Sequence, residues 1–203
     1  MKTLLLVCAT VCLASAQQRD GDCRPVVLAF GDSLTAGFGV PRGLGYPEQL
    51  QTLLDDGGYS YRVVNMGLPG DTSGRARARM TRALALNPAM VILELGGNDR
   101  GGGLASARTE ASLDELIRLF RSAGATVVLA QVDRGLGKVF GALATKYSLT
   151  LIPAFLAGVE GRPDLTIADG RHPNAEGYTI VSQTVMKAIT PLLSSRSTAS
   201  PCR

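Results

Sequence analysis

The chain has 203 residues, a length that suits one α/β domain with a substantial core and leaves no room for a second. Its formal net charge is +4, and the basic excess is mostly arginine. Arg75, Arg79 and Arg82 would share one face of a helix, with no aromatic residues interleaved among them. We therefore expect a solvated helix face there and no nucleic-acid partner.

The first residues are typical of a secretory signal peptide. Lys2 is followed by the apolar run 4–14 and by Ala14-Ser15-Ala16, which matches the small-residue pattern of a cleavage site. The apolar run is too short to anchor the chain stably in a bilayer. We therefore predict a signal peptide over residues 1–16, and a secreted or periplasmic mature protein that has no stable membrane anchor.

Cysteine usage agrees with export. Two of the four cysteines lie in the predicted signal peptide, which leaves Cys23 and Cys202 in the mature chain. Two cysteines in an exported protein suggest a disulfide, and the last helix of an α/β fold runs back toward the edge where the first strand begins. A disulfide between Cys23 and Cys202 is the prediction, and free thiols or an intermolecular bridge are the alternatives.

Short apolar runs alternate with helical patterns along residues 17–203. Val26 to Phe30 is an unbroken apolar run that ends at a turn, as expected of a parallel strand covered on both faces. Pro47 near its start and Gly57 after its end delimit the first long helix. By the same criteria we predict strands over 26–30, 61–65, 90–95, 126–132 and 149–152, and helices over 46–56, 73–86, 109–123, 136–147 and 174–193.

Strands that alternate with crossover helices indicate a single α/β domain over residues 17–203. We predict a three-layer sandwich in which helices cover both faces of a five-stranded parallel sheet. The expected strand order is the flavodoxin-like 2-1-3-4-5, which puts the topological switch point beside the first strand, at Ser33. A Ser-rich C-terminal tail follows from about residue 194.

All strands of such a sheet point the same way, so the loops that follow them share one rim. The loops after strands one, two, three and five carry Ser33, Gly70, Asn98, Asp169 and His172. His172 is the only histidine of the chain, so a serine nucleophile activated by histidine has no other base available. Each segment taken singly is equally compatible with ordinary turn chemistry.

The spacing within these segments suits acyl transfer. Asp169 lies three residues before His172, so one local turn lets its carboxylate accept the Nδ1 proton and leaves Nε2 free for the Ser33 hydroxyl. Donors for an oxyanion could come from the backbone N–H groups of Ser33 and Gly70 and from the side-chain amide of Asn98. Glycine at position 70 would also let a substrate approach the main chain closely.

In order and approximate spacing, these segments resemble the four blocks of the SGNH (GDSL) hydrolases, most closely the bacterial arylesterase, thioesterase and lysophospholipase branch. The resemblance covers nearly all of residues 17–203. It implies the fold predicted above, a catalytic triad of Ser33, Asp169 and His172, and an oxyanion hole of Ser33, Gly70 and Asn98. The matching segments are Gly31–Leu34, Gly70 within 65–73, Gly96–Asp99, and Asp169 with His172.

Two features bear on what the site binds. The loop at 133–138 is shorter than is usual in that branch, where it lines the acyl groove, and this suggests a more open groove. The family is not known for a required metal, and the chain has neither an HExxH motif nor paired CxxC motifs. We therefore expect no cofactor and no metal.

The resulting expectation is a secreted serine esterase that hydrolyses carboxylic esters through an acyl-enzyme on Ser33, with thioesters and lysophospholipids as further candidate substrates. The expected partner is a small-molecule ester or thioester, bound by a monomer. Alternatives are a carbohydrate acetyl esterase, disfavoured because the chain has no Trp for sugar stacking, and a non-catalytic secreted binding module on the same fold. Nucleotide binding is disfavoured because the loop after strand one lacks the third glycine of a dinucleotide fingerprint.

Overall fold

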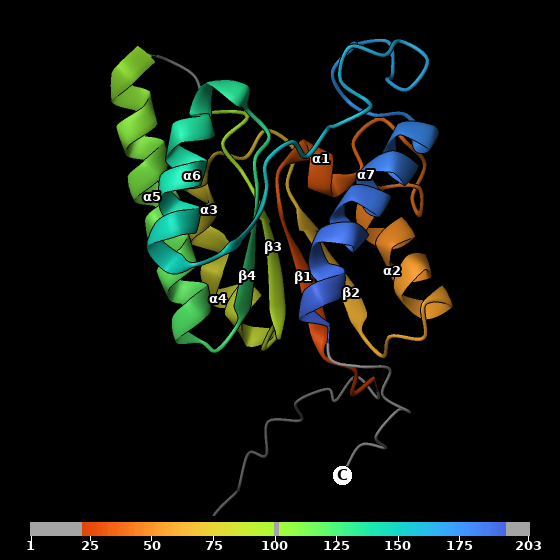
Figure 1. Ribbon diagram of the computed structural model, residues 1–203, viewed down its shortest axis with the longest axis horizontal. Coiled ribbons are helices and arrows are strands. Elements are labelled where there is room, and N and C mark those ends of the chain that lie inside the picture. Colours follow the sequence, from red (N-terminus) through yellow and green to blue (C-terminus); the bar gives the residue numbers. More distant parts are fainter. Residues whose placement is uncertain (1–21, 100–101, 194–203) are drawn as a thin grey trace, which may run out of the picture.

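The computed structural model describes residues 22–99 and 102–193 (Figure 1). Within these residues five parallel strands form one sheet in the order β2-β1-β3-β4-β5, which confirms the predicted topology. The strands are β1 (Val26–Gly31), β2 (Arg62–Gly67), β3 (Met90–Glu94), β4 (Thr126–Ala130) and β5 (Thr150–Ile152).

Helices fill the crossover connections, as predicted. The bounds of α2 coincide with those expected, because a proline near its first position and a glycine after its last delimit it clearly. The described helices are α1 (Ser33–Ala36), α2 (Tyr46–Asp56), α3 (Ser73–Ala76), α4 (Met80–Ala85), α5 (Gly102–Ser122), α6 (Gly137–Tyr147) and α7 (Ala175–Ile189). Short 3₁₀ turns, η1 (Arg77–Arg79), η2 (Arg134–Leu136) and η3 (Thr190–Leu192), adjoin four of them.

The segment predicted as one helix over 73–86 is instead α3, η1 and α4 in succession. The predicted solvated arginine face is also wrong at one position. Arg75 and Arg82 are exposed, but the Arg79 side chain is only 17% exposed and pairs with Asp71. Helical periodicity places Arg79 with the exposed arginines, but the carboxylate that draws it inward lies in the preceding loop, outside the periodic segment.

The sheet is the middle layer of three (Figure 1). On one face α2 and α7 pack against alternate strand residues such as Val27, Ile92 and Val128. On the other face α3, α4, α5 and α6 pack against the intervening residues, such as Leu28 and Leu93. Because β1 and β3 are buried on both sides, the central strands are rigidly held, and the loops at their carboxyl ends have a fixed base.

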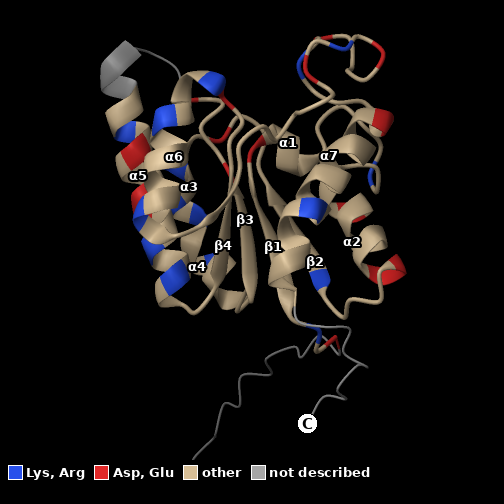
Figure 2. Cartoon of the chain, in the orientation of Figure 1, with Lys and Arg blue, Asp and Glu red and all other residues tan. Residues whose placement is uncertain are grey.

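Charged residues are mainly on the outer helices, with acidic residues at the carboxyl ends of the central strands (Figure 2). Among the described residues no helix is both long enough and apolar enough to cross a membrane. The predicted signal peptide 1–16, the tail from about 194 and Cys202 lie outside the described residues. The domain bounds and the bridge from Cys202 to Cys23 therefore stay predictions.

Candidate active site

β1 ends at a sharp turn that presents Ser33. Asp32 follows the strand and caps α1, since its Oδ1 accepts the N–H of Leu34 at 3.1 Å. Ser33 is the first residue of α1 and lines a cavity at the carboxyl edge of the sheet. Gly31 is required before this turn, because a Cβ there would lie 2.5 Å from the Glu94 carboxyl oxygen Oε2.

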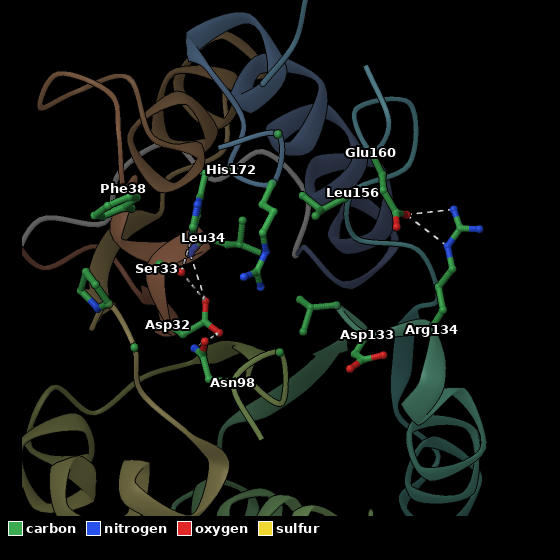
Figure 3. Close-up of a pocket in the computed structure, with 16 residues that line it drawn as sticks. Asp32, Ser33, Leu34, Phe38, Asn98, Asp133, Arg134, Leu156, Glu160 and His172 are labelled. Carbon is green, nitrogen blue, oxygen red and sulfur yellow. Dashed lines mark hydrogen bonds and ion pairs between the residues drawn. The ribbon is translucent and has the colours of Figure 1, made fainter. Parts of the chain in front are cut away.

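His172 and Asp169 come from the connection between β5 and α7. Asp169 Oδ1 accepts the backbone N–H groups of Arg171 and His172 at 2.9 and 3.0 Å, which closes the local turn predicted from their spacing. Asp169 Oδ2 lies 2.5 Å from His172 Nδ1, and His172 Nε2 lies 2.9 Å from Ser33 Oγ. The structure thus joins the three side chains by consecutive hydrogen bonds, and the His172–Ser33 contact, visible in Figure 3, links residues that are 139 positions apart.

The hydrogen bonds to Asp169 favour its ionised form. Hydrogen bonds from the backbone N–H groups of His172 and Arg171, and then from the imidazole, lower the pKa of Asp169 to about 2. An ionised Asp169 accepts Nδ1–H, which leaves Nε2 as the acceptor of the Ser33 hydroxyl. The Phe38 ring lies 4.8 Å from the imidazole, centroid to centroid, and covers one side of it.

Gly70 and Asn98 line the same cavity as Ser33. Gly70 has φ +74°, a conformation that side chains disfavour, and its position is open enough for a ligand to approach the main chain. Asn98 differs from the simplest expectation of a free donor. Its Nδ2 donates to Asp32 Oδ2 (Figure 3) and to the Asp71 carbonyl oxygen, each at 2.9 Å. A ligand oxygen would have to replace one of these two acceptors, or share an amide hydrogen with it.

The cavity has a volume of about 570 Å³. One end holds Ser33 and the side chains around it, and apolar groups, among them Leu34 and Leu156, form part of the wall. The opposite end in Figure 3 is bounded by Arg134 and Glu160, whose Nη2 and Oε2 atoms lie 2.9 Å apart. The short loop after β4 therefore does reach the cavity, through η2 and the residues before it.

Sequence reasoning missed two ionisable side chains behind the cavity, one fully buried and one partly buried. Glu94, at the end of β3, is fully buried, and its Oε2 accepts the Asp32 N–H at 3.2 Å and the Thr35 hydroxyl at 2.7 Å. The second is Arg79, whose Nε and Nη2 donate to Asp71 Oδ2. The signal that could have revealed Glu94 is a carboxyl side chain within the otherwise apolar run 90–95. Among the described residues, no group of three or more potential ligand side chains could hold a metal ion.

Residues 29–180 match the model of the GDSL-like lipase/acylhydrolase family. The chain belongs to this family. A curated relative, the esterase TesA of Pseudomonas aeruginosa, is 35% identical over 95% of this chain and 100% of the relative. The arylesterase of Vibrio mimicus is 30% identical over 93% and 98%. Both relatives are named as esterases, in keeping with a family of lipases and acylhydrolases.

Solved structures of the GDSL-like family agree with this placement. The crystal structure of TesA superposes with a TM-score of 0.77 at 36% identity, covering 83% of this chain and 99% of the other. The esterase AlinE4, described as a member of the SGNH-hydrolase family, superposes with a TM-score of 0.67 at 32% identity over 85% and 98%. The five-stranded parallel order is therefore that of SGNH hydrolases.

Proposed function

We propose that the protein is a secreted or periplasmic serine esterase in which Ser33 is the nucleophile, His172 the general base and Asp169 the group that orients it. The observation that carries the proposal is the continuous pair of contacts, 2.5 Å from Asp169 Oδ2 to Nδ1 and 2.9 Å from Nε2 to Ser33 Oγ. Ser33 Oγ also lies 3.4 Å from Asp32 Oδ1, but the shorter contact favours transfer of its proton to the imidazole.

The reaction follows from this arrangement. Nε2 of His172 removes the hydroxyl proton as Ser33 Oγ attacks the ester carbonyl, and the negative charge passes to the carbonyl oxygen. When the tetrahedral intermediate collapses, the C–O bond to the alcohol breaks and the imidazolium donates its proton to the departing oxygen. Water then attacks the acyl-enzyme by the same route, which releases the acid and restores Ser33.

The developing oxyanion needs fixed donors. We assign the backbone N–H groups of Ser33 and Gly70 and the Asn98 amide to this role. The N–H of Ser33 belongs to the first turn of α1, where backbone donors have no partner within the helix. Asn98 Nδ2 already faces Asp32 and Asp71 with both of its hydrogens, so it is held in place before substrate binds. Its hydrogen bond to Asp32 is the one we expect to be shared with the oxyanion.

The size and lining of the cavity support esters with short to medium acyl chains as the proposed substrates. The cavity's volume of about 570 Å³ and its partly apolar wall accommodate such a chain, and the Arg134–Glu160 ion pair lies at the end of the cavity opposite Ser33. Thioesters are the second candidate substrate class, supported by a relative from Escherichia coli named thioesterase 1/protease 1/lysophospholipase L1, which is 30% identical over 82% of this chain and 84% of the relative. Export is proposed from the residues of the predicted signal peptide.

The test is hydrolysis of p-nitrophenyl esters from acetate to palmitate by residues 17–203, with Ser33→Ala as the matched variant. Activity that peaks at short to medium chains and disappears in Ser33→Ala is the expected result. A decanoyl thioester measured in parallel tests the second substrate class. A folded protein that is inactive on every ester and thioester would refute the proposal and favour a non-catalytic binding module.

A further inference from the structure

Arg79 joins three segments of the chain that lie behind the cavity. Its Nη1 donates to the Met66 carbonyl at 2.5 Å and its Nη2 donates to the Gly31 carbonyl at 3.1 Å. Its Nε and Nη2 also donate to Asp71 Oδ2, at 2.9 and 2.7 Å. The guanidinium further lies 4.2 Å from the centroid of the Phe30 ring. One side chain thus connects the carboxyl ends of β1 and β2 with the loop that follows β2.

Each connected segment leads directly to a proposed oxyanion donor. Gly31 is two residues before Ser33, and Asp71 directly follows Gly70. The Asp71 carbonyl oxygen accepts one of the Asn98 amide hydrogens at 2.9 Å. A shift of Asp71 would therefore move the Gly70 main chain and release the Asn98 amide together, although Arg79 itself is not among the residues that line the cavity.

The chemistry of these contacts requires arginine. The Asp71 side chain is 2% exposed and that of Arg79 is 17% exposed, so the ion pair is shielded from competing water. A planar guanidinium has five N–H donors in a fixed arrangement, and here it serves a carboxylate and two carbonyls at once. A lysine ammonium at the same place is a single point, which can approach the carboxylate or the carbonyls but cannot span all three segments.

We propose that Arg79 is a positioning residue for the oxyanion hole, which holds Asp71 so that the Gly70 N–H and the Asn98 amide converge on the same point as the Ser33 N–H. The inference rests on the proposed esterase function. The negative charge on the carbonyl oxygen develops in the transition state and is absent from the bound ester. Arg79 should therefore stabilise the transition state more than the enzyme–ester complex. The hydrogen bonds of Arg79 involve neither Leu34 nor Leu156, which form part of the apolar wall.

The test compares Arg79→Lys and Arg79→Met with Arg82→Met, which removes an exposed arginine from the same segment. Steady-state hydrolysis of p-nitrophenyl acetate is measured for each, together with melting temperature. We expect kcat to fall roughly 10- to 100-fold in both Arg79 variants, with KM changed less than about threefold, since small displacements of catalytic groups have costs of this size. Arg82→Met is expected to match the wild type.

Two further readouts separate positioning from general destabilisation. The rate of covalent inactivation by a p-nitrophenyl phosphonate, whose phosphoryl oxygen would occupy the same hole, should fall in parallel with kcat. Added methylguanidinium should restore part of the kcat of an Arg79→Ala variant, whereas added methylammonium should not. If the variant had only lost stability, methylguanidinium would not restore more kcat than methylammonium does.

The outcomes are distinct. Arg79 variants that keep kcat within twofold of the wild type, or that lose activity only by raising KM, overturn the inference while leaving the esterase function intact. If Arg79→Met does not fold, Arg79→Lys decides, because it keeps the charge beside Asp71. A wild-type protein with no Ser33-dependent hydrolysis overturns both the inference and the proposed function.

Discussion

Replacing Glu94 with glutamine should remove a pH-dependent loss of stability. Glu94 Oε2 accepts hydrogen bonds from Asp32 N–H and Thr35, while Oε1 is buried without a hydrogen-bond partner among the described residues. Glutamine has almost the same shape, and its carbonyl oxygen can accept both hydrogen bonds. Its amide nitrogen then takes the place of Oε1, so the variant resembles the protonated acid without being able to ionise.

The size of the effect follows from the surroundings of Glu94. Full burial, and then the nearby Asp32 carboxylate, raise its pKa well above the ordinary value of 4.5. Above pH 4.5 the unfolded chain releases this proton while the folded chain retains it. The folded state therefore loses stability relative to the unfolded state as pH rises, by up to about 1.4 kcal/mol per pH unit, until Glu94 ionises in the folded protein.

Urea unfolding of the wild type and Glu94→Gln between pH 5.5 and 7.5 measures this difference. The free energy of unfolding of Glu94→Gln should rise relative to the wild type by up to about 3 kcal/mol over these two pH units. Glu110→Gln, which changes an exposed carboxylate, should follow the wild-type slope. Parallel curves for the wild type and Glu94→Gln would mean that Glu94 is ionised in the folded protein and that the reasoning is wrong.

Four further measurements test other parts of the site and fold. Asn98→Ala should lower kcat about 10²- to 10³-fold if its amide binds the oxyanion, and a loss of only a few-fold would remove it from the hole. Esterase activity should depend on the His172 imidazole, because its Nε2 accepts the serine proton, and a His172→Ala variant with activity near that of the wild type would contradict this role. A hydrogen bond from the Lys146 ammonium lowers the pKa of Asp114 to about 2, so Asp114→Asn should lower the free energy of unfolding by about 1 kcal/mol at pH 7. This difference should disappear as pH falls from about 4 toward 2, and an equal cost at pH 2 would refute the electrostatic cause. A non-reducing peptide map of the protein should contain a Cys23–Cys202 link, and its absence would exclude the predicted bridge.

Local sequence patterns were sufficient to predict the architecture and to propose the triad. An apolar run such as Val26 to Phe30 is buried in almost any arrangement, and the alternation of such runs with helices permits few topologies. Ser33 and His172 could be assigned to one rim because parallel strands end on the same edge of a sheet. The Asp169–His172 turn could be predicted because the two residues are only three apart, so no distant part of the chain is needed to form it.

The tertiary structure alone decided which polar and ionisable side chains are buried and what each one contacts. Arg79 has the same helical spacing as its exposed neighbours, yet it turns inward because Asp71 and two strand-end carbonyls meet there. Asn98 donates to Asp32, 66 residues away, and Glu94 accepts from Thr35, 59 residues away. Local spacing contains no information on such pairs, since their energy depends on burial and on distances that exist only after the strands have been placed side by side.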